Sequence, residues 1–535
     1  MGGLCQGETE VPGVLPFLPL VEILCLPLPC GLSCNRSSGI LLFDFSTSPL
    51  HDSPFCYLPN GLAVCASNEE VGTGRVHSIS QKGFLCYNAL CIHKSVGLMK
   101  LELIAPATSD SPNRKKTLIP PLGLAMVAAV TPPDVEISLT DENVTAIDFQ
   151  KQIDLVGITA LTVTAQRAYE IADTFRARGV KVVLGGIHPS VLPEEARQHA
   201  DAIVIGEAEG VWPKVIEDFK ANKLQRVYQQ RERPSLVGLP IPRRDLFAKG
   251  AYYVRNTLST TRGCPYSCAF CTVTSFFGHT YRCRPVEEIL REIETLSKKN
   301  FIAFVDDNIG GNPKFAKELF RALIPYKIKW VSQASVTIAK DNELLKLAAD
   351  SGCISLFIGF ESISPASLAA VGKKINVVDD YERVIKRIHS HGIAVHGFFI
   401  FGFDEEDEDV FRRTVHFAQK MRLETAQFDY LTPYPGTALG ESLDKAGRIV
   451  TKDWARYGYE LVFEPRPMTR KTLQRGHDWT WCEFYSLPSI WRRLGIRHPH
   501  PWVFWIANLS YRAHWRKKRR TNSGNSWRFL RNRDG

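Results

Sequence analysis

Residues 262–272 read Arg-Gly-Cys-Pro-Tyr-Ser-Cys-Ala-Phe-Cys-Thr, and this stretch says most about the fold of the chain. Its cysteines, Cys264, Cys268 and Cys271, follow a β-rich run and a glycine with the spacing Cys-x3-Cys-x2-Cys. Three thiolates on one tight loop can hold three irons of a four-iron cluster and leave the fourth iron without a protein ligand. An iron left open in this way can bind a substrate.

The count of three cysteines separates this loop from other metal sites. An electron-transfer cluster or a structural zinc site normally has a fourth protein ligand. The alternatives are a zinc knuckle that takes a distant ligand, such as His279 or Cys283, and three incidental thiols. The spacing favours the open cluster over both.

The motif resembles the signature of the radical S-adenosylmethionine (SAM) superfamily, in which an aromatic residue, here Phe270, precedes the last cysteine. The resemblance implies that the open iron chelates the amino and carboxylate groups of SAM. It also implies that an external donor, such as flavodoxin or ferredoxin, supplies the electron that cleaves SAM to a 5′-deoxyadenosyl radical. Because such a cluster is oxygen-sensitive, we expect a reducing, cytoplasmic compartment.

Apolar strand-like runs alternate with helical runs around this loop. We expect strands at residues 258–261, 302–306, 330–334, 355–360, 394–401 and 426–431. The helices expected between them are 286–297, 314–324, 343–349, 379–390 and 409–421. Six strands and five intervening helices predict a partial TIM-like (β/α)6 barrel over residues 253–450, whose chemistry collects at the carboxyl ends of the strands.

Polar residues and glycines follow every predicted barrel strand. After the cysteine loop they are Asp306, Asp307, Asn308, Gln333, Ser335, Glu361, Gly402, Asp404 and residues 433–436. Each could be an ordinary turn or cap, but together they predict a polar rim that includes SAM contacts. By resemblance, residues 306–308 contact the SAM amino group, although the family often has Gly-Gly-Glu there. Glu361 and the backbone around Gly402 match the ribose and adenine contacts.

A second α/β unit, residues 99–235, precedes the barrel and is joined to it by a proline-bearing linker, residues 236–252. We expect strands at 101–105, 135–139, 155–159, 180–184 and 202–205. A helix at 166–178 has one buried face, made of Ala168, Ile171, Ala172 and Phe175. The alternation predicts a doubly wound, Rossmann-like parallel sheet, whose ligands lie beyond the carboxyl ends of the strands.

Three loops of this unit, residues 159–162, 185–188 and 206–209, follow predicted strands. Glycine after a strand is often a plain turn, but it also lets the backbone approach a bulky ligand. Directly before a radical SAM core, Gly-Gly-Ile-His-Pro and Gly-Glu-Ala-Glu resemble the cobalamin-binding domain of cobalamin-dependent radical SAM enzymes. The resemblance implies cobalamin contacts at Thr159, Gly185, Gly186, His188, Gly206 and Glu207.

The cobalamin-like unit lacks the motif Asp-x-His-x-x-Gly, whose histidine binds cobalt from below in many cobalamin proteins. The loop where it would sit, residues 108–116, contains no histidine. We therefore expect cobalt with no histidine beneath it, and binding through contacts with the corrin. The place of His188 in a glycine loop favours a contact with the corrin edge over cobalt ligation.

The first 98 residues differ in composition from the rest of the chain. Eight of the fourteen cysteines precede Met99, in a region with no sustained helical or strand periodicity. A disulfide-rich secreted module is one alternative. We favour a disordered extension that arises from a start codon placed too far upstream, because Met99 opens a strand typical of an α/β domain.

The last segment, residues 451–535, predicts a mainly helical cap with a basic, aromatic tail. From Arg466 onward there are 16 Lys and Arg against 3 Asp and Glu, which is +13, so the preceding part carries 10 − 13 = −3. Seven of the ten tryptophans lie beyond Arg466, at 479, 481, 491, 502, 505, 515 and 527. A plain cap, a cap with peripheral contact to the inner face of a membrane, and a nucleic-acid surface all fit, the last least well. Residues 501–509 are too few to span a bilayer, but they can lie in its interface with residues 516–520 toward anionic lipid.

These features together predict an enzyme that uses a 4Fe-4S cluster, SAM and cobalamin. The resemblance implies that the 5′-deoxyadenosyl radical removes hydrogen from an unactivated carbon and that methylcobalamin delivers the methyl group, so few acid/base residues are needed. Residues 432–437, 464–469 and 483–486 are similar to methylases of hopanoid lipids, which favours a lipid or other small-molecule substrate. A tetrapyrrole or natural product would keep the same motifs. The alternatives are an oxidoreductase or cyclase without methyl transfer, and a non-catalytic cobalamin or redox sensor.

Overall fold

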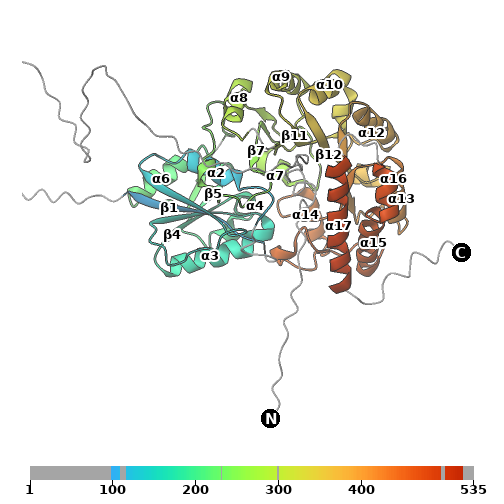
Figure 1. Ribbon diagram of the computed structural model, residues 1–535. Coiled ribbons are helices and arrows are strands. Elements are labelled where there is room, and N and C mark those ends of the chain that lie inside the picture. Colours follow the sequence, from blue (N-terminus) through green and yellow to red (C-terminus); the bar gives the residue numbers. More distant parts are fainter. Residues whose placement is uncertain (1–97, 109–115, 231, 298–300, 496–500, 522–535) are drawn as a thin grey trace, which may run out of the picture. The chain divides into compact units, whose positions relative to one another are not determined.

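The computed structural model describes residues 98–108, 116–230, 232–297, 301–495 and 501–521 (Figure 1). The extension predicted for residues 1–98 lies outside the described residues, apart from Leu98, and so does the tryptophan at position 527. The described chain contains two six-stranded parallel sheets, one in each α/β unit. The predicted fold class is therefore confirmed.

The first sheet has the strand order β2-β1-β3-β4-β5-β6. Its strands are β1 (Met99–Ala105), β2 (Val135–Asp141), β3 (Leu155–Thr159), β4 (Lys181–Gly185), β5 (Ala202–Ile205) and β6 (Val227–Gln229). The helices are α2 (Leu122–Ala129), α3 (Ala165–Ala177), α4 (Ile187–Val191), α5 (Pro193–Ala196) and α6 (Trp212–Lys220), with a 3-10 turn η1 (Thr162–Thr164). Of the six strands, only β6 was missed by the sequence analysis, because three residues are too few for a periodic pattern.

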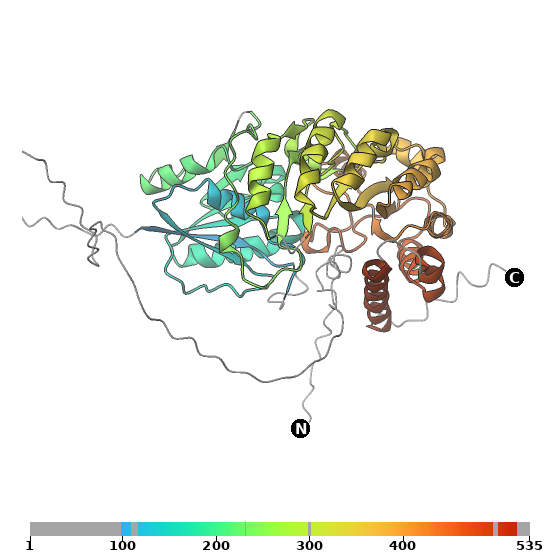
Figure 2. The ribbon, with the colours of Figure 1, turned by 45° about the horizontal axis from the view of Figure 1, so that its top comes forward.

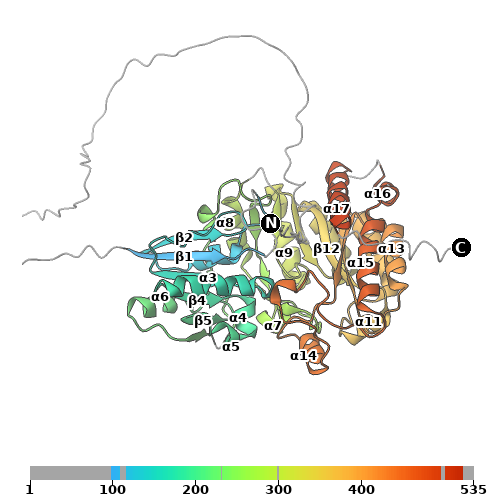
Figure 3. The ribbon, with the colours of Figure 1, turned by 90° about the horizontal axis from the view of Figure 1, so that it is seen from below.

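Helices cover both faces of this sheet (Figures 1 and 3). Helix α3 packs on one face through Ala168, Ile171, Ala172 and Phe175, which are fully buried as predicted. Helices α2 and α6 pack on the other face, around Trp212. The buried layers leave the carboxyl ends of the strands as the edge where the glycine loops gather.

The second sheet has the order β14-β13-β12-β11-β10-β7, with β7 and β14 as its edges among the described strands. Its strands are β7 (Asn256–Leu258), β10 (Ile302–Phe304), β11 (Trp330–Ala334), β12 (Cys353–Glu361), β13 (Ala394–Phe401) and β14 (Thr425–Tyr430). The accompanying helices are α8 (Val286–Glu294), α9 (Pro313–Leu323), α10 (Asn342–Asp350), α11 (Pro365–Ala370), α12 (Tyr381–Ser390), α13 (Val410–Lys420) and α14 (Ala438–Lys445). These helices lie outside the sheet, which is the partial barrel that the sequence predicts (Figure 2).

A short antiparallel hairpin of β8 (Thr261–Arg262) and β9 (Arg282–Cys283) leaves the barrel after β7. It carries the cysteine loop and helix α7 (Thr272–Phe277). Short 3-10 turns complete the two units and the cap: η2 (Arg244–Leu246), η3 (Ile324–Tyr326), η4 (Val336–Lys340), η5 (Val378–Asp380) and η6 (Trp454–Arg456).

Helices α15 (Arg470–Phe484), α16 (Leu487–Leu494) and α17 (Pro501–Thr521) form the predicted cap. Stacked rings join α15 to α17, with Trp481 4.9 Å from Trp515 and Tyr485 4.7 Å from Tyr511. The buried guanidinium of Arg493 donates to the carbonyl oxygens of Leu423 and Glu424, just before β14. Among the residues that the structure describes, no helix combines the length and apolar character needed to cross a membrane.

Candidate active site

The cysteine loop is held in place by backbone constraints on both sides. Gly263 has a φ of +86°, and a Cβ at this position would overlap the carbonyl oxygen of Thr280, so only glycine fits. Further along, the amide of Ala269 donates to Val371 (3.0 Å), and its carbonyl accepts from Leu439 (2.9 Å). These bonds tie the loop to the segment after β12 and to the start of α14.

The thiols of the loop are partly buried together. Burial raises the pKa of Cys264, Cys268 and Cys271, the last to about 11. Binding to iron would remove these protons, as metal ligation does for cysteine. In the described ranges no three His, Cys, Asp or Glu side chains converge on one metal ion. A four-iron cluster needs each thiolate on a different iron, so three partly buried thiols on one loop have the chemistry that such a cluster requires.

A buried ion pair lies beside the loop. The Lys373 ammonium is 2.7 Å from Glu361, and both side chains are at most 13% exposed. The same ammonium lies 5.9 Å from the ring centroid of Phe270. Glu361 adopts a left-handed φ of +63°, a strained conformation of the kind that persists at functional sites. Lys373 thus lies between Glu361 and Phe270, and the sequence analysis missed it because it lies in a loop and not at a strand end.

The three residues after β10 differ in their roles. The Asp306 side chain is buried and accepts hydrogen bonds from the amides and hydroxyls of Thr260 and Thr261. Its carboxylate therefore fixes the start of the hairpin, and its expected contact with the SAM amino group stays a prediction. Asp307 lines the cavity described below, and burial, with the nearby Asp306, raises its pKa to about 6. The Asn308 amide nitrogen lies 3.9 Å from the Cys264 sulfur.

Of the remaining rim residues, Ser335 lies near the cysteine loop, whereas Gly402 and Asp404 are paired with other parts of the barrel unit. Ser335 lies near the loop, because its amide donates to the Asn308 side chain (3.0 Å), and Gln333 is exposed at the end of β11. Gly402 is buried, and its amide donates to Glu406 (2.9 Å). That amide is therefore already paired, and the adenine contact expected from the backbone around Gly402 stays a prediction. Likewise Asp404 pairs with Arg448 at 2.7 Å.

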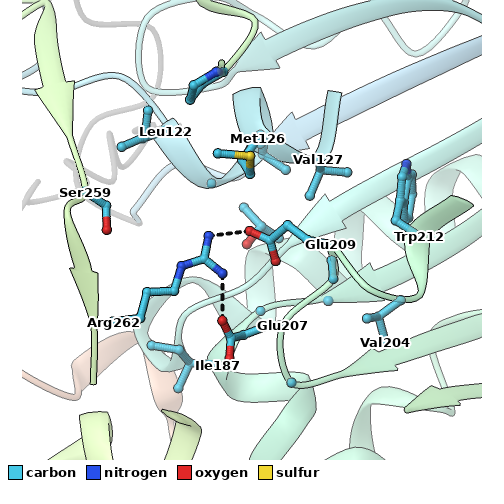
Figure 4. Close-up of a pocket in the computed structure, with 18 of the residues that line it drawn as sticks. Leu122, Met126, Val127, Ile187, Val204, Glu207, Glu209, Trp212, Ser259 and Arg262 are labelled. Carbon is cyan, nitrogen blue, oxygen red and sulfur yellow. Dashed lines mark hydrogen bonds and ion pairs between the residues drawn. The ribbon is translucent and has the colours of Figure 1, made fainter. Parts of the chain in front are cut away.

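A cavity of about 400 Å³ lies where the glycine loops of the first unit face the hairpin (Figure 4). Helix α2 contributes apolar wall residues, including Leu122, Met126 and Val127. The predicted residues that line the cavity are Thr159, Gly185, Gly186, Gly206 and Glu207. A large, mostly apolar wall interrupted by glycines suits a flat macrocycle such as the corrin. Arg262, which directly precedes the cysteine loop, and Asp307 also line this cavity.

His188 is not among the residues that line the cavity. Its side chain is fully buried, with Nδ1 3.4 Å from Thr162 and Nε2 3.2 Å from Glu195. Its ring also packs 5.3 Å from that of Trp454. These contacts join the first unit to Trp454 of the C-terminal segment, and the expected contact between His188 and the corrin edge stays a prediction.

Ion pairs connect the cavity loop to the cysteine hairpin. The Glu207 carboxylate binds Arg262 through one oxygen and Arg282 through the other, both at 2.6 Å. Arg262 also pairs with Glu209, as the dashed lines in Figure 4 show. Glu207 is 2% exposed, so these charges are shielded from water. The sequence analysis missed the two arginines, because no local sequence pattern indicates that they pair with acidic residues of the other unit.

Replacing Glu207 with glutamine is expected to destabilise the protein by about 3 kcal/mol or more, because it leaves buried arginines without their counter-charge. The measurement is the shift of the urea unfolding midpoint. Glu217→Gln is the matched control: Glu217 is 70% exposed and pairs with Lys214 on the surface, so its loss should cost less than about 0.5 kcal/mol. Equal shifts for the two variants would contradict a structural role for the Glu207 pairs.

The partial barrel, the loop of three cysteines and the glycine-lined cavity define a radical SAM core joined to a cobalamin-binding domain. Comparison with known families agrees: residues 258–418 match the radical SAM superfamily, and residues 115–216 match the B12 binding domain. The chain is 33% identical to bacteriochlorophyllide d C-12(1)-methyltransferase of Chlorobaculum tepidum over 73% of its own length and 87% of that protein. It is 30% identical to the C-8(2)-methyltransferase of the same organism over 74% of its length and 91% of that protein.

Other comparisons extend this picture. The hopanoid C-2 methylase of Rhodopseudomonas palustris is 27% identical over 63% of this chain and 66% of that protein. The radical SAM methyltransferase TsrM from Kitasatospora setae has a similar fold, with a TM-score of 0.58, 17% identity and coverage of 79% of this chain and 98% of TsrM. The chain therefore belongs to the cobalamin-dependent radical SAM methyltransferases, and its cofactors are a 4Fe-4S cluster, SAM and cobalamin.

Proposed function

We propose that the enzyme methylates an unactivated side-chain carbon of a tetrapyrrole related to bacteriochlorophyllide. The observation that carries this proposal is the identity of 33% and 30% to two bacteriochlorophyllide d methyltransferases, over about three quarters of the chain. The hopanoid methylase shares less, 27% over 63% of the chain. A lipid, which the sequence motifs favoured, thus becomes the second candidate substrate.

Each unit of the protein has a separate task in this reaction. When bound, the reduced cluster and SAM supply the oxidant that removes a hydrogen atom from carbon, and cobalamin supplies the methyl group that replaces it. Cys264, Cys268 and Cys271 would hold the cluster. Glu361, with Lys373 beside it, would form part of the wall against which SAM lies. The glycine loops and α2 would hold the corrin and keep water from the reacting carbon.

The proposal includes cobalt with no histidine on its lower face. Two observations on the described residues support it. The part of the cavity wall that α2 contributes is apolar. In many cobalamin proteins the loop with the cobalt-binding histidine comes just before this helix. The one histidine of the glycine loops, His188, is engaged with Thr162 and Glu195.

The test is anaerobic turnover of the reconstituted enzyme with SAM, cobalamin, a strong reductant and a bacteriochlorophyllide deuterated in its side chains. We expect a product one methylene heavier, equal amounts of 5′-deoxyadenosine and S-adenosylhomocysteine, and deuterium in the 5′-deoxyadenosine. Methylation of a hopanoid but of no tetrapyrrole would overturn the proposed substrate class. A sensor would form none of these products.

A cyclase is the second candidate function, because anaerobic magnesium-protoporphyrin IX monomethyl ester cyclase of Cereibacter sphaeroides is 25% identical over 65% of this chain. That activity would give 5′-deoxyadenosine without S-adenosylhomocysteine, so the same assay separates it from methyl transfer.

We also propose that the electron comes from an external flavodoxin or ferredoxin, and that the enzyme works in the cytoplasm at the inner face of a membrane. The partial exposure of the three cysteines supports electron entry near the loop. Replacing a chemical reductant with each purified donor, and comparing the rates of 5′-deoxyadenosine formation, tests the donor directly.

A further inference from the structure

Large apolar side chains are exposed on the outer faces of α16 and α17. In order of exposed fraction they are Trp502 (73%), Trp491 (56%), Leu487 (49%), Leu509 (42%) and Ile506 (38%). These five belong to the fourteen exposed large apolar residues of the described chain, yet the two helices contain only 8 and 21 residues. We call this set the α16–α17 face. Such a concentration of exposed apolar surface marks an interaction site more often than chance.

The face is a continuous strip because of the helix period. Trp502, Ile506 and Leu509 recur at intervals of four and three residues, which places them on one side of α17. The opposite side of α17, with Ala507 and Tyr511, is buried against the protein. On the neighbouring helix, Trp491 lies 5.8 Å from the ring of Trp505, so the two outer surfaces meet. Helix α17 is therefore apolar on the side that packs and on the side that faces outward.

The chain segment that carries the strip has charge of one sign. Residues 484–521 contain nine Lys and Arg and no Asp or Glu. Arg492 and Arg516 are exposed beside the strip, and the basic run continues to residue 520. Tryptophan is enriched at the boundary between water and lipid, and each basic residue near an anionic membrane contributes about 1 kcal/mol. A second copy of the chain would instead bring two positive surfaces together.

We infer that the α16–α17 face docks on the surface of a membrane rich in anionic lipid. The tryptophans and aliphatic side chains enter the interface, and the basic residues contact the head groups, as in interfacial amphipathic helices. Nucleic acid fits less well, because the most exposed residues of the strip are apolar while phosphates need cations along their path.

The position of the face in the fold leaves the active site free during docking. The first turns of α17 pack near Ala394, the first residue of β13, and Asn508 donates to the carbonyl of Glu424 just before β14. Figures 1 and 3 show α17 beside α15 and α16. These contacts are at the amino ends of the barrel strands, whereas the cysteine hairpin is at the carboxyl ends. None of the five residues of the face lines the cavity, so docking through them tethers the enzyme without covering the cavity, whatever the substrate is.

Flotation of the full-length holoenzyme with lipid vesicles tests this inference. We expect it to float with phosphatidylglycerol–phosphatidylcholine vesicles and to float at least about tenfold less with pure phosphatidylcholine, or with the anionic vesicles in 1 M salt. The triple variant Trp491→Ser, Trp502→Ser, Ile506→Ser should lose at least about tenfold in binding to the anionic vesicles. Its methyl transfer to a substrate in solution should be unchanged, since these residues lie away from the cavity.

A matched control removes apolar residues of similar exposure elsewhere: Ile324→Ser, Val377→Ser and Val450→Ser, which are 38%, 48% and 41% exposed. This variant should bind vesicles like the wild type. Equal flotation of both triple variants, or no flotation of the wild type, would overturn the inference. The inference would also be overturned if the wild type were a dimer that the first variant splits into monomers. Loss of vesicle binding after nuclease treatment would overturn it as well. Vesicle binding requires no turnover, so its failure is distinct from failure of the proposed methyl transfer.

Discussion

Replacing Cys268 with alanine is expected to lower methyl transfer and 5′-deoxyadenosine formation by at least about three orders of magnitude. The reason is the coordination count: with two thiolates left, the loop can no longer hold a cluster in which one iron alone is open. The fold should persist, because the backbone carbonyl of Cys268, which accepts from the Cys271 amide at 3.0 Å, does not depend on the thiol. Iron and sulfide content and the electron paramagnetic resonance of the reduced cluster measure the loss.

Cys283→Ser is the control that separates the cluster from a four-ligand site. Cys283 lies in β9, on the hairpin that carries the loop, and was, with His279, a candidate for a fourth ligand. We expect the serine variant to keep about four irons per chain and the spectral change on adding SAM. If the Cys283 variant lost iron as the Cys268 variant does, the iron proposed for SAM would already carry a protein ligand.

The backbone of this protein could be predicted from the sequence more fully than its side chains. Strands such as β12 and β13 have long apolar runs, and the alternation with amphipathic helices fixes a parallel sheet. The strand ends follow from these runs, so the residues that come directly after each strand could be named from the sequence. Spacing alone also identified the cluster loop, because its ligands are neighbours in the sequence.

The direction of a side chain beyond a strand end does not follow from the strand pattern. Asp306 and Asp307 are adjacent, yet the first turns inward to the Thr260 and Thr261 amides and only the second reaches the cavity. The same uncertainty applies to His188, whose partner Glu195 lies seven residues away on another helix. Pairs between units, such as Arg262 with Glu207, have no local signal at all, because their partners lie 55 residues apart.

Replacing Gly123 with phenylalanine is expected to weaken cobalamin binding at least about 100-fold, which corresponds to about 2.7 kcal/mol. Gly123 lines the cavity on α2, and a Cβ added there meets no heavy atom within 4 Å. The new ring would therefore extend into the space proposed for the corrin. Glycine is a poor helix former, so the substitution should not lower the urea unfolding midpoint. Visible absorbance on titration with hydroxocobalamin measures the affinity, and iron content should be unchanged.

Gly123→Ala is the matched variant, since it keeps the helix-favouring change but adds only a methyl group to the wall. We expect its affinity for cobalamin to stay within about threefold of the wild type, because an apolar wall next to open space tolerates one extra methyl. A difference in cobalamin affinity between the two variants then shows that the phenylalanine ring fills the space of the corrin. It does not reflect the stability of α2, which both substitutions favour. If the phenylalanine variant bound cobalamin like the wild type, the corrin would lie outside this cavity.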